Sequence, residues 1–312
     1  MANTREIQSR MKSIEDTMKI TNAMYMISST KLRRAKKELK DTEPYFYTLQ
    51  GMLARVIRHL PEVQHKYISD GSEQGAQEGR KKAFLVITAD KGLAGAYNHN
   101  VLKLAEEQLD GDTDHHLLVV GEVGRQYFHM KKIPVEEHFL YTAQNPTMHR
   151  ARVITAKIFE LYESGAVDEV HMIFTSMKNG LQTETNQIQL LPIDKREFQT
   201  AKVPVDMYQE EFGYKPSLEA VLNNVIPNYV CGYIYGALVE SYCSEHNARM
   251  VAMQAANDSS QAMIHDLSVE YNRVRQAAIT QEITEVIAGA KAQKRKKQKR
   301  MQEKQMQSIE GV

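Results

Sequence analysis

The sequence contains no tryptophan, and only two cysteines and eight prolines among its 312 residues. It also contains no run of about 18 apolar residues, the length that a membrane-spanning helix requires. Cys231 and Cys243 fall on one predicted helix, and their separation in sequence corresponds to roughly 18 Å, which is too far for a disulfide. We therefore expect two buried, free thiols and no direct insertion of the chain into a bilayer.

The first residues also lack the features of a targeting segment. Met1 leads directly into a polar stretch that contains Glu6, with neither the apolar core of a secretory signal nor the acid-free composition of an organellar one. We therefore expect a cytoplasmic, reducing environment, which agrees with the low cysteine count.

Charge is distributed unevenly along the chain. Residues 1–40 hold ten Lys/Arg against four Asp/Glu, and residues 291–312 hold eight against two. Residues 41–290 hold 22 basic and 33 acidic side chains, so an acidic middle lies between two basic ends. Basic runs often bind nucleic acid, so a nucleic-acid-binding coiled-coil scaffold is one candidate class. A small α/β enzyme with helical arms is another, although the overall net charge of +1 disfavours the first.

Apolar residues recur at alternating steps of four and three through the first sixty positions. Thirteen of the sixteen positions in this series are apolar and none is charged. A sustained period of 3.5 residues predicts a long coiled-coil helix, which we assign to residues 1–68. The series is Ile7, Met11, Ile14, Met18, Thr21, Tyr25, Ser28, Leu32, Ala35, Leu39, Thr42, Phe46, Leu49, Leu53, Val56 and Leu60.

The same spacing returns after Pro216 and predicts a second coiled-coil helix. We assign residues 206–292 to this helical segment and residues 293–312 to a basic extension. Because the second helix is longer than the first, its last turns have to extend beyond Met1. A lone helix cannot satisfy an apolar face in water, so another protein is expected to surround this part. The apolar face consists of Ile279, Ile283, Val286, Ile287 and Ala290.

The periodicity between the two helices is that of strands. Residues 83–90 and 117–121 are typical of buried strands, each followed by a helical stretch. Residues 167–177 and 181–193 alternate in polarity around a short turn, which predicts a hairpin. The sequence therefore predicts parallel strands followed by a hairpin.

These patterns together define the expected fold class: α/β, with a long antiparallel coiled coil of the N- and C-terminal helices plus a central Rossmann-like α/β domain. The central domain is assigned to residues 83–205, after a Gly-rich polar linker over 69–82.

Four segments, spread in order along the chain, carry a resemblance to a known family. They read KITNAMYMISSTKLRRA at 19–35, TADKGLAGAYN at 88–98, SEHNARMVAMQAAN at 244–257 and YNRVRQAAITQEITEVIAGA at 271–290. On these segments the chain resembles, from end to end, the gamma subunit of the F-type rotary ATP synthase. The resemblance implies a central shaft within a hexamer of alternating alpha and beta subunits, with the α/β domain next to the epsilon subunit and the membrane c-ring.

The resemblance also implies which residues meet the beta subunit. Arg275, Gln276 and Thr280 match family positions that touch a beta-subunit catch loop, and Glu282 and Glu285 lie on the same segment. Residues that match the shaft surface facing the acidic part of beta are Met24, Lys31, Arg33 and Arg34.

No catalytic residue, cofactor or metal site is expected in this chain. Neither a Walker sequence nor G-x-G-x-x-G is present, so ATP turnover would belong to beta. The resemblance and the absence of a targeting segment lead us to expect a peripheral protein on the cytoplasmic face of a bacterial cell membrane, coupling ion flow to ATP synthesis or hydrolysis, with no nucleic-acid partner.

Overall fold

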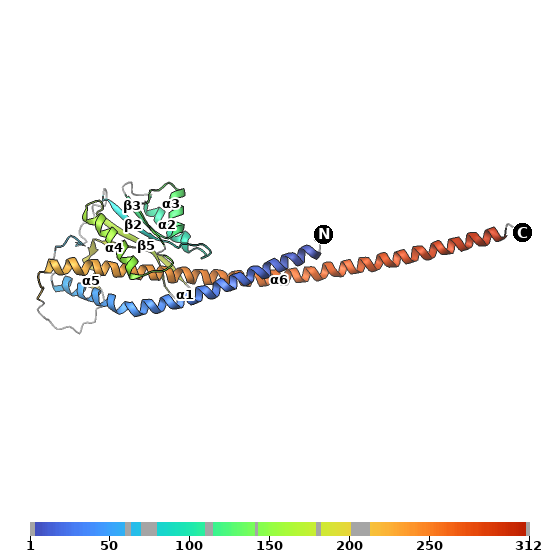
Figure 1. Ribbon diagram of the computed structural model, residues 1–312, viewed down its shortest axis with the longest axis horizontal. Helices are drawn as coiled ribbons and strands as arrows, with labels where there is room; N and C mark the ends of the chain where they lie inside the picture. Colours follow the sequence, from blue (N-terminus) through green and yellow to red (C-terminus); the bar gives the residue numbers. More distant parts are fainter. Residues whose placement is uncertain are drawn as a thin grey trace. The chain divides into compact units, whose positions relative to one another are not determined.

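The computed structural model describes residues 4–59, 64–69, 80–109, 115–140, 143–178, 182–200 and 213–309. They form two compact units. The first consists of Met1–Ala23 with Gln254–Val312, and the second of Met24–Met253. Two long helices, α1 (Thr4–His59) and α6 (Leu218–Ile309), each contribute to both units (Figure 1).

The predicted heptad series of α1 is confirmed. Every position of the series from Ile7 to Val56 is buried or half-buried, whereas most positions between them are exposed. Leu60, the last member, lies outside the described residues. The helix ends at His59, close to Pro61, because a proline disfavours helical backbone in the residue before it.

The second unit contains a five-stranded sheet in the order β4-β3-β2-β5-β6. The first four strands in this order are mutually parallel, and β6 pairs with β5 antiparallel. The predicted parallel strands and hairpin are therefore confirmed, although residues 179–181 of the turn lie outside the described residues. The strands are β2 (Lys82–Ile87), β3 (His115–Val120), β4 (Glu137–Phe139), β5 (Glu169–Met177) and β6 (Thr183–Leu191).

Helices and a small strand pair complete this unit. Strand β1 (Ile68–Ser69) pairs in parallel with β7 (Ile193–Asp194) outside the main sheet. The sequence patterns did not predict this pair or β4, because two or three residues are too few to show a period. The helices are α2 (Tyr97–Leu109), α3 (Glu122–Met130), α4 (Met148–Glu163) and α5 (Lys195–Thr200).

The main sheet separates two hydrophobic cores, because alternate side chains of a strand point to opposite faces. Phe84 and Val86 of β2 face a core that contains residues of α2 and the Phe128 side chain of α3. Leu85 and Ile87 face the other core, to which α4, α1 and α6 all contribute (Figure 1). The N-terminal part of α6 is therefore part of the α/β domain as well as of the helix pair.

Within the second unit, α6 is covered on all sides over several turns. No residue of the fully described stretch from Ile234 to Met250 is exposed. Cys243 lies in this stretch, and it and Cys231 are buried and free, as predicted. Burial raises the pKa of Cys243 to about 11.

A close contact fixes α1 against α6 in this unit. A Cβ atom added to Gly232 would lie 2.0 Å from Cδ1 of Phe46, so the Phe46 ring fills the space where a side chain would be. The same ring lies 6.0 Å, centroid to centroid, from that of Tyr235. One helical turn further on, a Cβ added to Gly236 would meet nothing within 4 Å.

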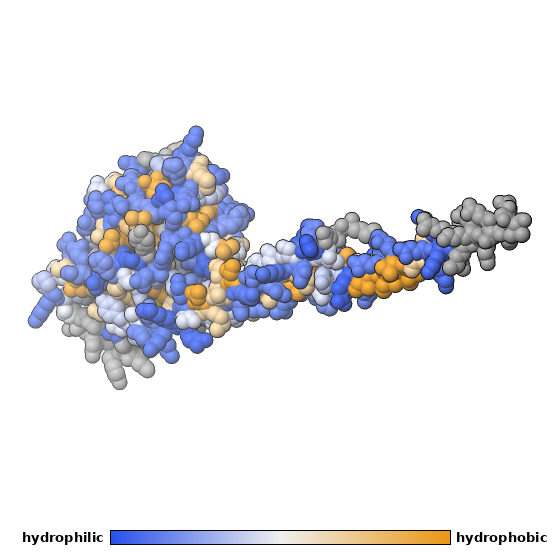
Figure 2. Space-filling model, turned by 45° about the vertical axis from the view of Figure 1, so that its right-hand side comes forward, coloured by the Kyte–Doolittle hydropathy of each residue, from blue (hydrophilic) through white to orange (hydrophobic). Residues whose placement is uncertain are grey.

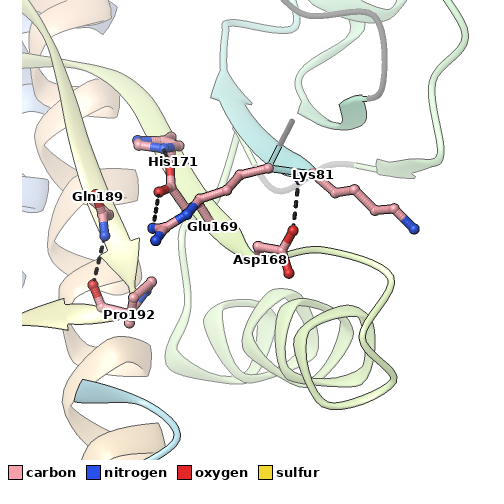
Figure 3. Close-up of polar contacts among 7 residues, drawn as sticks. Lys81, Asp168, Glu169, His171, Gln189 and Pro192 are labelled. Atoms are coloured by element: carbon pink, nitrogen blue, oxygen red, sulfur yellow. Dashed lines mark hydrogen bonds and ion pairs between the residues drawn. The ribbon is translucent and has the colours of Figure 1, made fainter. Parts of the chain in front are cut away.

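At the N-terminal end of β5, a buried carboxylate pairs with two half-buried basic side chains. The Glu169 carboxylate pairs with Arg80 Nη1 at 3.0 Å and with His171 Nε2 at 3.1 Å. Figure 3 shows Glu169 next to His171, and Asp168 accepting a hydrogen bond of 2.9 Å from the Lys81 amide. Nearby, the Gln189 side chain donates a 2.9 Å hydrogen bond to the carbonyl of Pro192. Burial raises the pKa of Glu169, but the bonds from His171 and Arg80 outweigh it, and the net pKa is lowered.

The first unit is also an antiparallel pairing of the two helices. The hydroxyl of Thr21 donates to Oδ1 of Asn257, while Met18, three residues earlier, lines a shared groove with Gln261 and Ile264. Moving toward the N-terminus of α1 therefore corresponds to moving toward the C-terminus of α6. Among the described residues of both units, no helix is apolar over enough length to cross a membrane.

The contrast between Gly232 and Gly236 gives a stability prediction. We expect Gly232→Ala to destabilise the chain by about 1–3 kcal/mol, because the new methyl group displaces the Phe46 ring. Gly236→Ala is the matched control and should stabilise by about 0.5–1 kcal/mol, since alanine loses less backbone entropy in a helix. Urea unfolding followed by circular dichroism measures both, and equal effects of the two substitutions would contradict the observed packing.

The lowered pKa of Glu169 predicts a pH dependence of stability. A carboxyl group whose pKa is lower in the folded state stabilises the fold above its unfolded pKa, and this contribution is lost as the pH falls through the folded value. We expect Glu169→Gln to reduce the free energy of unfolding at pH 7, and the deficit to shrink toward pH 3. Glu160→Gln, which changes an exposed side chain, is the control and should leave the pH profile of the wild type intact.

Candidate functional site

The C-terminal part of α6 forms an exposed surface in the first unit. Every described side chain from Arg275 to Lys297 is exposed, whereas Tyr271 and Val274 are still half-buried. The prediction that the last turns form a single helix is therefore confirmed for this range.

An apolar stripe runs along the exposed helix. Ile279 is 46% exposed, Ile283 54%, Val286 72% and Ile287 49%. Figure 2 shows apolar residues gathered on this stretch of α6. At about 100° per residue, these four positions fall within an arc of roughly 100°, so they share one face.

This stripe is not a continuation of the seam that faces α1. Ile264, Leu267, Tyr271 and Val274 are half-buried in the first unit and define the seam. The apolar stripe is rotated from that seam by roughly 130° around the helix axis. A longer α1 would therefore not cover the stripe, and its burial requires another chain.

The five predicted beta-contact residues are all exposed, but they do not share one face. Helical geometry places Gln276 and Thr280 on the side of the stripe, and Glu282 and Glu285 on the side of the seam, with Arg275 between them. The Thr280 hydroxyl donates to the Gln276 carbonyl at 2.9 Å. Gln281 donates to Oε1 of Glu285 at 3.0 Å. The exposed helix thus presents polar groups around most of its circumference, which suits a partner that surrounds it.

The four predicted shaft residues of α1 lie in the second unit. Met24 is half-buried, and Lys31, Arg33 and Arg34 are exposed. Arg34 forms an ion pair of 2.9 Å with Glu38 on the same helix. Met24 and Lys31 share one face of α1, whereas Arg33 points to the opposite side. The structure therefore does not gather these four residues into one patch.

A buried polar cluster connects two of the segments that carry the family resemblance. Arg249 of α6 pairs with Glu245 at 2.6 Å, and both side chains are less than a tenth exposed. Arg249 also donates to the Gly92 carbonyl at 3.0 Å and to that of Lys91 at 3.4 Å. The loop that follows β2 is thus held against α6 through main-chain carbonyls.

The pKa values of two neighbouring side chains are shifted by burial and by the charges of this cluster. Burial, together with the charges of Arg249 and Lys31, lowers the pKa of His246 to about 3. The ring is therefore neutral, and its Nδ1 accepts from Nη1 of Arg249 at 3.2 Å. Burial raises the pKa of Tyr97, with a smaller contribution from the charge of Glu245.

Arg249 and Glu245 were not among the residues predicted from the sequence. The available signal was an i, i+4 pair of opposite charges, Glu245 and Arg249, within the predicted helix. This signal is weak, because such pairs are usually exposed. Only the position of α6 under the sheet shows that both side chains are buried.

Comparisons with known proteins agree with this geometry. A family model described as ATP synthase matches residues 3–293. An ATP synthase gamma chain from Ruminiclostridium cellulolyticum is 41% identical over 292 residues, covering 93% of this chain and 98% of that protein. One from Acetivibrio thermocellus is 40% identical over 298 residues, covering 94% and 100%.

A solved structure has the same fold. A chain in the cryo-EM structure of the Euglena gracilis mitochondrial ATP synthase, OSCP/F1/c-ring, aligns with a TM-score of 0.63 at 14% identity, over 93% of this chain and 94% of that one. At this identity the likeness concerns the fold. On the family match and the relatives together, the chain belongs to the ATP synthase gamma chain family.

The buried pair predicts a large effect of one substitution. Arg249→Met leaves the Glu245 carboxylate buried without its partner, and loss of one member of such a pair costs about 3–5 kcal/mol of unfolding free energy. Arg275→Met changes an exposed arginine on the same helix and should alter stability by no more than about 0.5 kcal/mol. Urea unfolding compares the two variants, and a similar small change in both would show that the Arg249 contacts do not stabilise the fold.

Proposed function

We propose that this chain is the central rotor shaft of an F-type ATP synthase. In this role it couples ion flow through the membrane sector to ATP synthesis or hydrolysis at the beta-subunit sites. The observation that carries the proposal is the exposed end of α6, in a chain that belongs to the gamma family. Its apolar stripe faces away from the seam, so an enclosing partner is required, and a ring of alpha and beta subunits meets that requirement.

Rotation acts through the asymmetry of the helix. An apolar stripe on one side and Gln281, Glu282 and Glu285 on another present different chemistry to each surrounding beta subunit. A ligand that binds conformations of a protein with different affinities shifts their populations. Turning such a helix would therefore move each beta subunit through its nucleotide states in sequence, while the chemistry of ATP stays with beta.

The residues proposed to meet beta are Arg275, Gln276 and Thr280, with Glu282 and Glu285 in polar contacts beside them. All five are exposed, so each contact is worth only about 0–1 kcal/mol. Weak contacts suit a shaft whose partners change at every step, because strong ones would hold it in place. Met24, Lys31, Arg33 and Arg34 are proposed to meet the acidic part of beta at different rotary positions, since they lie on different faces of α1.

The remaining assignments are part of the same proposal. The partners are the alpha and beta subunits, the epsilon subunit and the c-ring, and the chain would act at the cytoplasmic face of a bacterial membrane. It would have no ATPase activity alone. The residue ranges proposed from the sequence are 1–68 and 206–292 for the coiled coil, 69–82 for the linker, 83–205 for the α/β domain and 293–312 for the extension. The helices themselves are bounded differently, because α1 ends at His59 and α6 begins at Leu218 and runs to Ile309.

Reconstitution tests the proposal directly. Purified alpha and beta subunits are combined with this chain, and ATP hydrolysis is measured together with assembly on a sizing column. We expect one copy of this chain per alpha–beta hexamer, and no hydrolysis by this chain alone. Hydrolysis by the isolated chain, or failure to enter the hexamer, would contradict the proposal. Salt-dependent binding of RNA or DNA instead of assembly would favour the scaffold alternative.

Substitutions on the exposed helix test the beta contact. In the assembled enzyme, Arg275→Ala and Gln276→Ala should each lower gradient-driven ATP synthesis by up to about fivefold, because each removes a contact worth at most about 1 kcal/mol. The melting temperature of the isolated chain should not change. Glu270→Ala, on an exposed position roughly opposite the stripe, is the matched control and should synthesise ATP at the wild-type rate.

A further inference from the structure

A groove in the second unit is not used by the proposed rotor function. It lies between α1, α6 and the β5–β6 hairpin, and its volume is about 500 Å³. Sites for small organic ligands commonly measure about 300–1,000 Å³. All of its lining residues belong to the second unit, so it lies apart from the exposed end of α6.

Aromatic rings form much of the wall. Phe46 and Tyr47 of α1 face the groove from one side, and Tyr229 and Tyr233 of α6 from another. The rings of Tyr229 and Tyr233 meet edge to face with centroids 6.2 Å apart. The face of an aromatic ring carries partial negative charge and attracts cations within about 6 Å of its centroid.

The groove is open beside Gly236, where α6 has no side chain. The space above Gly232 is filled by the Phe46 ring, but nothing fills the space above Gly236, which lines the groove. A side chain at Gly236 would project into this space without meeting a neighbour within 4 Å of its Cβ. A substitution at Gly236 is therefore a direct way to narrow the groove.

Two carboxylates give the groove a negative charge. Glu240 and Glu43 both line it, whereas its lining in the described part of the chain includes no lysine or arginine. Glu43 accepts a hydrogen bond of 3.3 Å from the Tyr47 hydroxyl. Burial, followed by repulsion from Glu43, raises the pKa of Glu240, and no cation among the described residues is a cause of that shift. A carboxylate in this environment gains more from a cation than an exposed one does, because water screens the attraction less.

We infer that this groove binds a small organic cation, an ammonium group carried on an aromatic or aliphatic body. The ammonium would pair with Glu240 and Glu43, and the body would lie beside Gly236 and pack against the Phe46 ring. Because such a ligand contacts α1, α6 and the hairpin at once, and only when they are folded together, it stabilises the folded chain by mass action.

Binding of a defined probe tests the inference on the purified full-length chain. Phenethylammonium is compared with phenethyl alcohol, which has the same aromatic body without the charge. Titration calorimetry gives the affinities, and thermal melting gives the stabilisation. We expect the ammonium to bind at least about tenfold more tightly than the alcohol, since a charge-assisted pair is the added interaction. We also expect only the ammonium to raise the melting temperature at equal concentration.

Variants locate the site. Glu240→Gln should lower the affinity for phenethylammonium by about tenfold or more, while Glu219→Gln, an exposed position on the same helix, should leave it unchanged. Gly236→Leu should abolish binding by filling the groove. If Gly236→Leu lowers the melting temperature of the chain, Gly236→Ala is used, and it should weaken binding without lowering that temperature.

Two results would overturn the inference. One is equal affinity for the ammonium and the alcohol, because the carboxylates would then contribute nothing. The other is wild-type binding by Gly236→Leu or by Glu240→Gln, because the probe would then bind elsewhere. None of these measurements uses the alpha and beta subunits, so this inference and the rotor proposal can fail independently.

Discussion

The second unit depends on the burial of α6 on all sides over several turns of its N-terminal half. Between Ile234 and Met250 the helix packs against the sheet on one side and α1 on another, and the Arg249–Glu245 pair holds the loop after β2 from the same stretch. A helix enclosed in this way cannot turn or slide without breaking the core that it shares with α1, α4 and the sheet. The α/β domain and the helix pair of this unit therefore behave as one cooperative body, although their sequences have different periodicities.

The same helix has the opposite character in the first unit. From Arg275 to Lys297 its side chains are exposed, and its apolar residues lie on a face that is rotated away from the seam with α1. Stability in the second unit comes from contacts within the chain, whereas the apolar stripe at the end of α6 is not buried by the described part of the chain. The N-terminal half of α6 is thus packed within the second unit, whereas its exposed C-terminal part offers a surface for contacts with other chains.

Much of this architecture follows from the sequence, because it rests on long periodic patterns. The 3.5-residue series of α1, the buried strands near Phe84 and Leu118 and the hairpin of β5 with β6 were all predicted. Strand β4 and the β1–β7 pair are too short for a period to show.

The burial of Arg249 could not be predicted, because a charged i, i+4 pair on a buried helix has the same sequence pattern as one on a solvated helix. The exposed residues near Arg275 came from the family resemblance, and their spread around the helix required the structure. The groove beside Gly236 depends on side chains from α1, α6 and the hairpin, and no local pattern encodes it.

The length of α6 has a consequence for the reach of this chain. The helix runs to Ile309, whereas the family model ends at residue 293. At about 1.5 Å per residue, those additional turns amount to roughly 24 Å of helix. Lys294, Arg295, Lys296 and Lys297 at its beginning are all exposed. This chain could contact an acidic surface within that distance. A homologue whose helix ends where the family match ends could not reach it, so ATP synthases that share the rest of the gamma chain could differ in the contacts made by the end of α6.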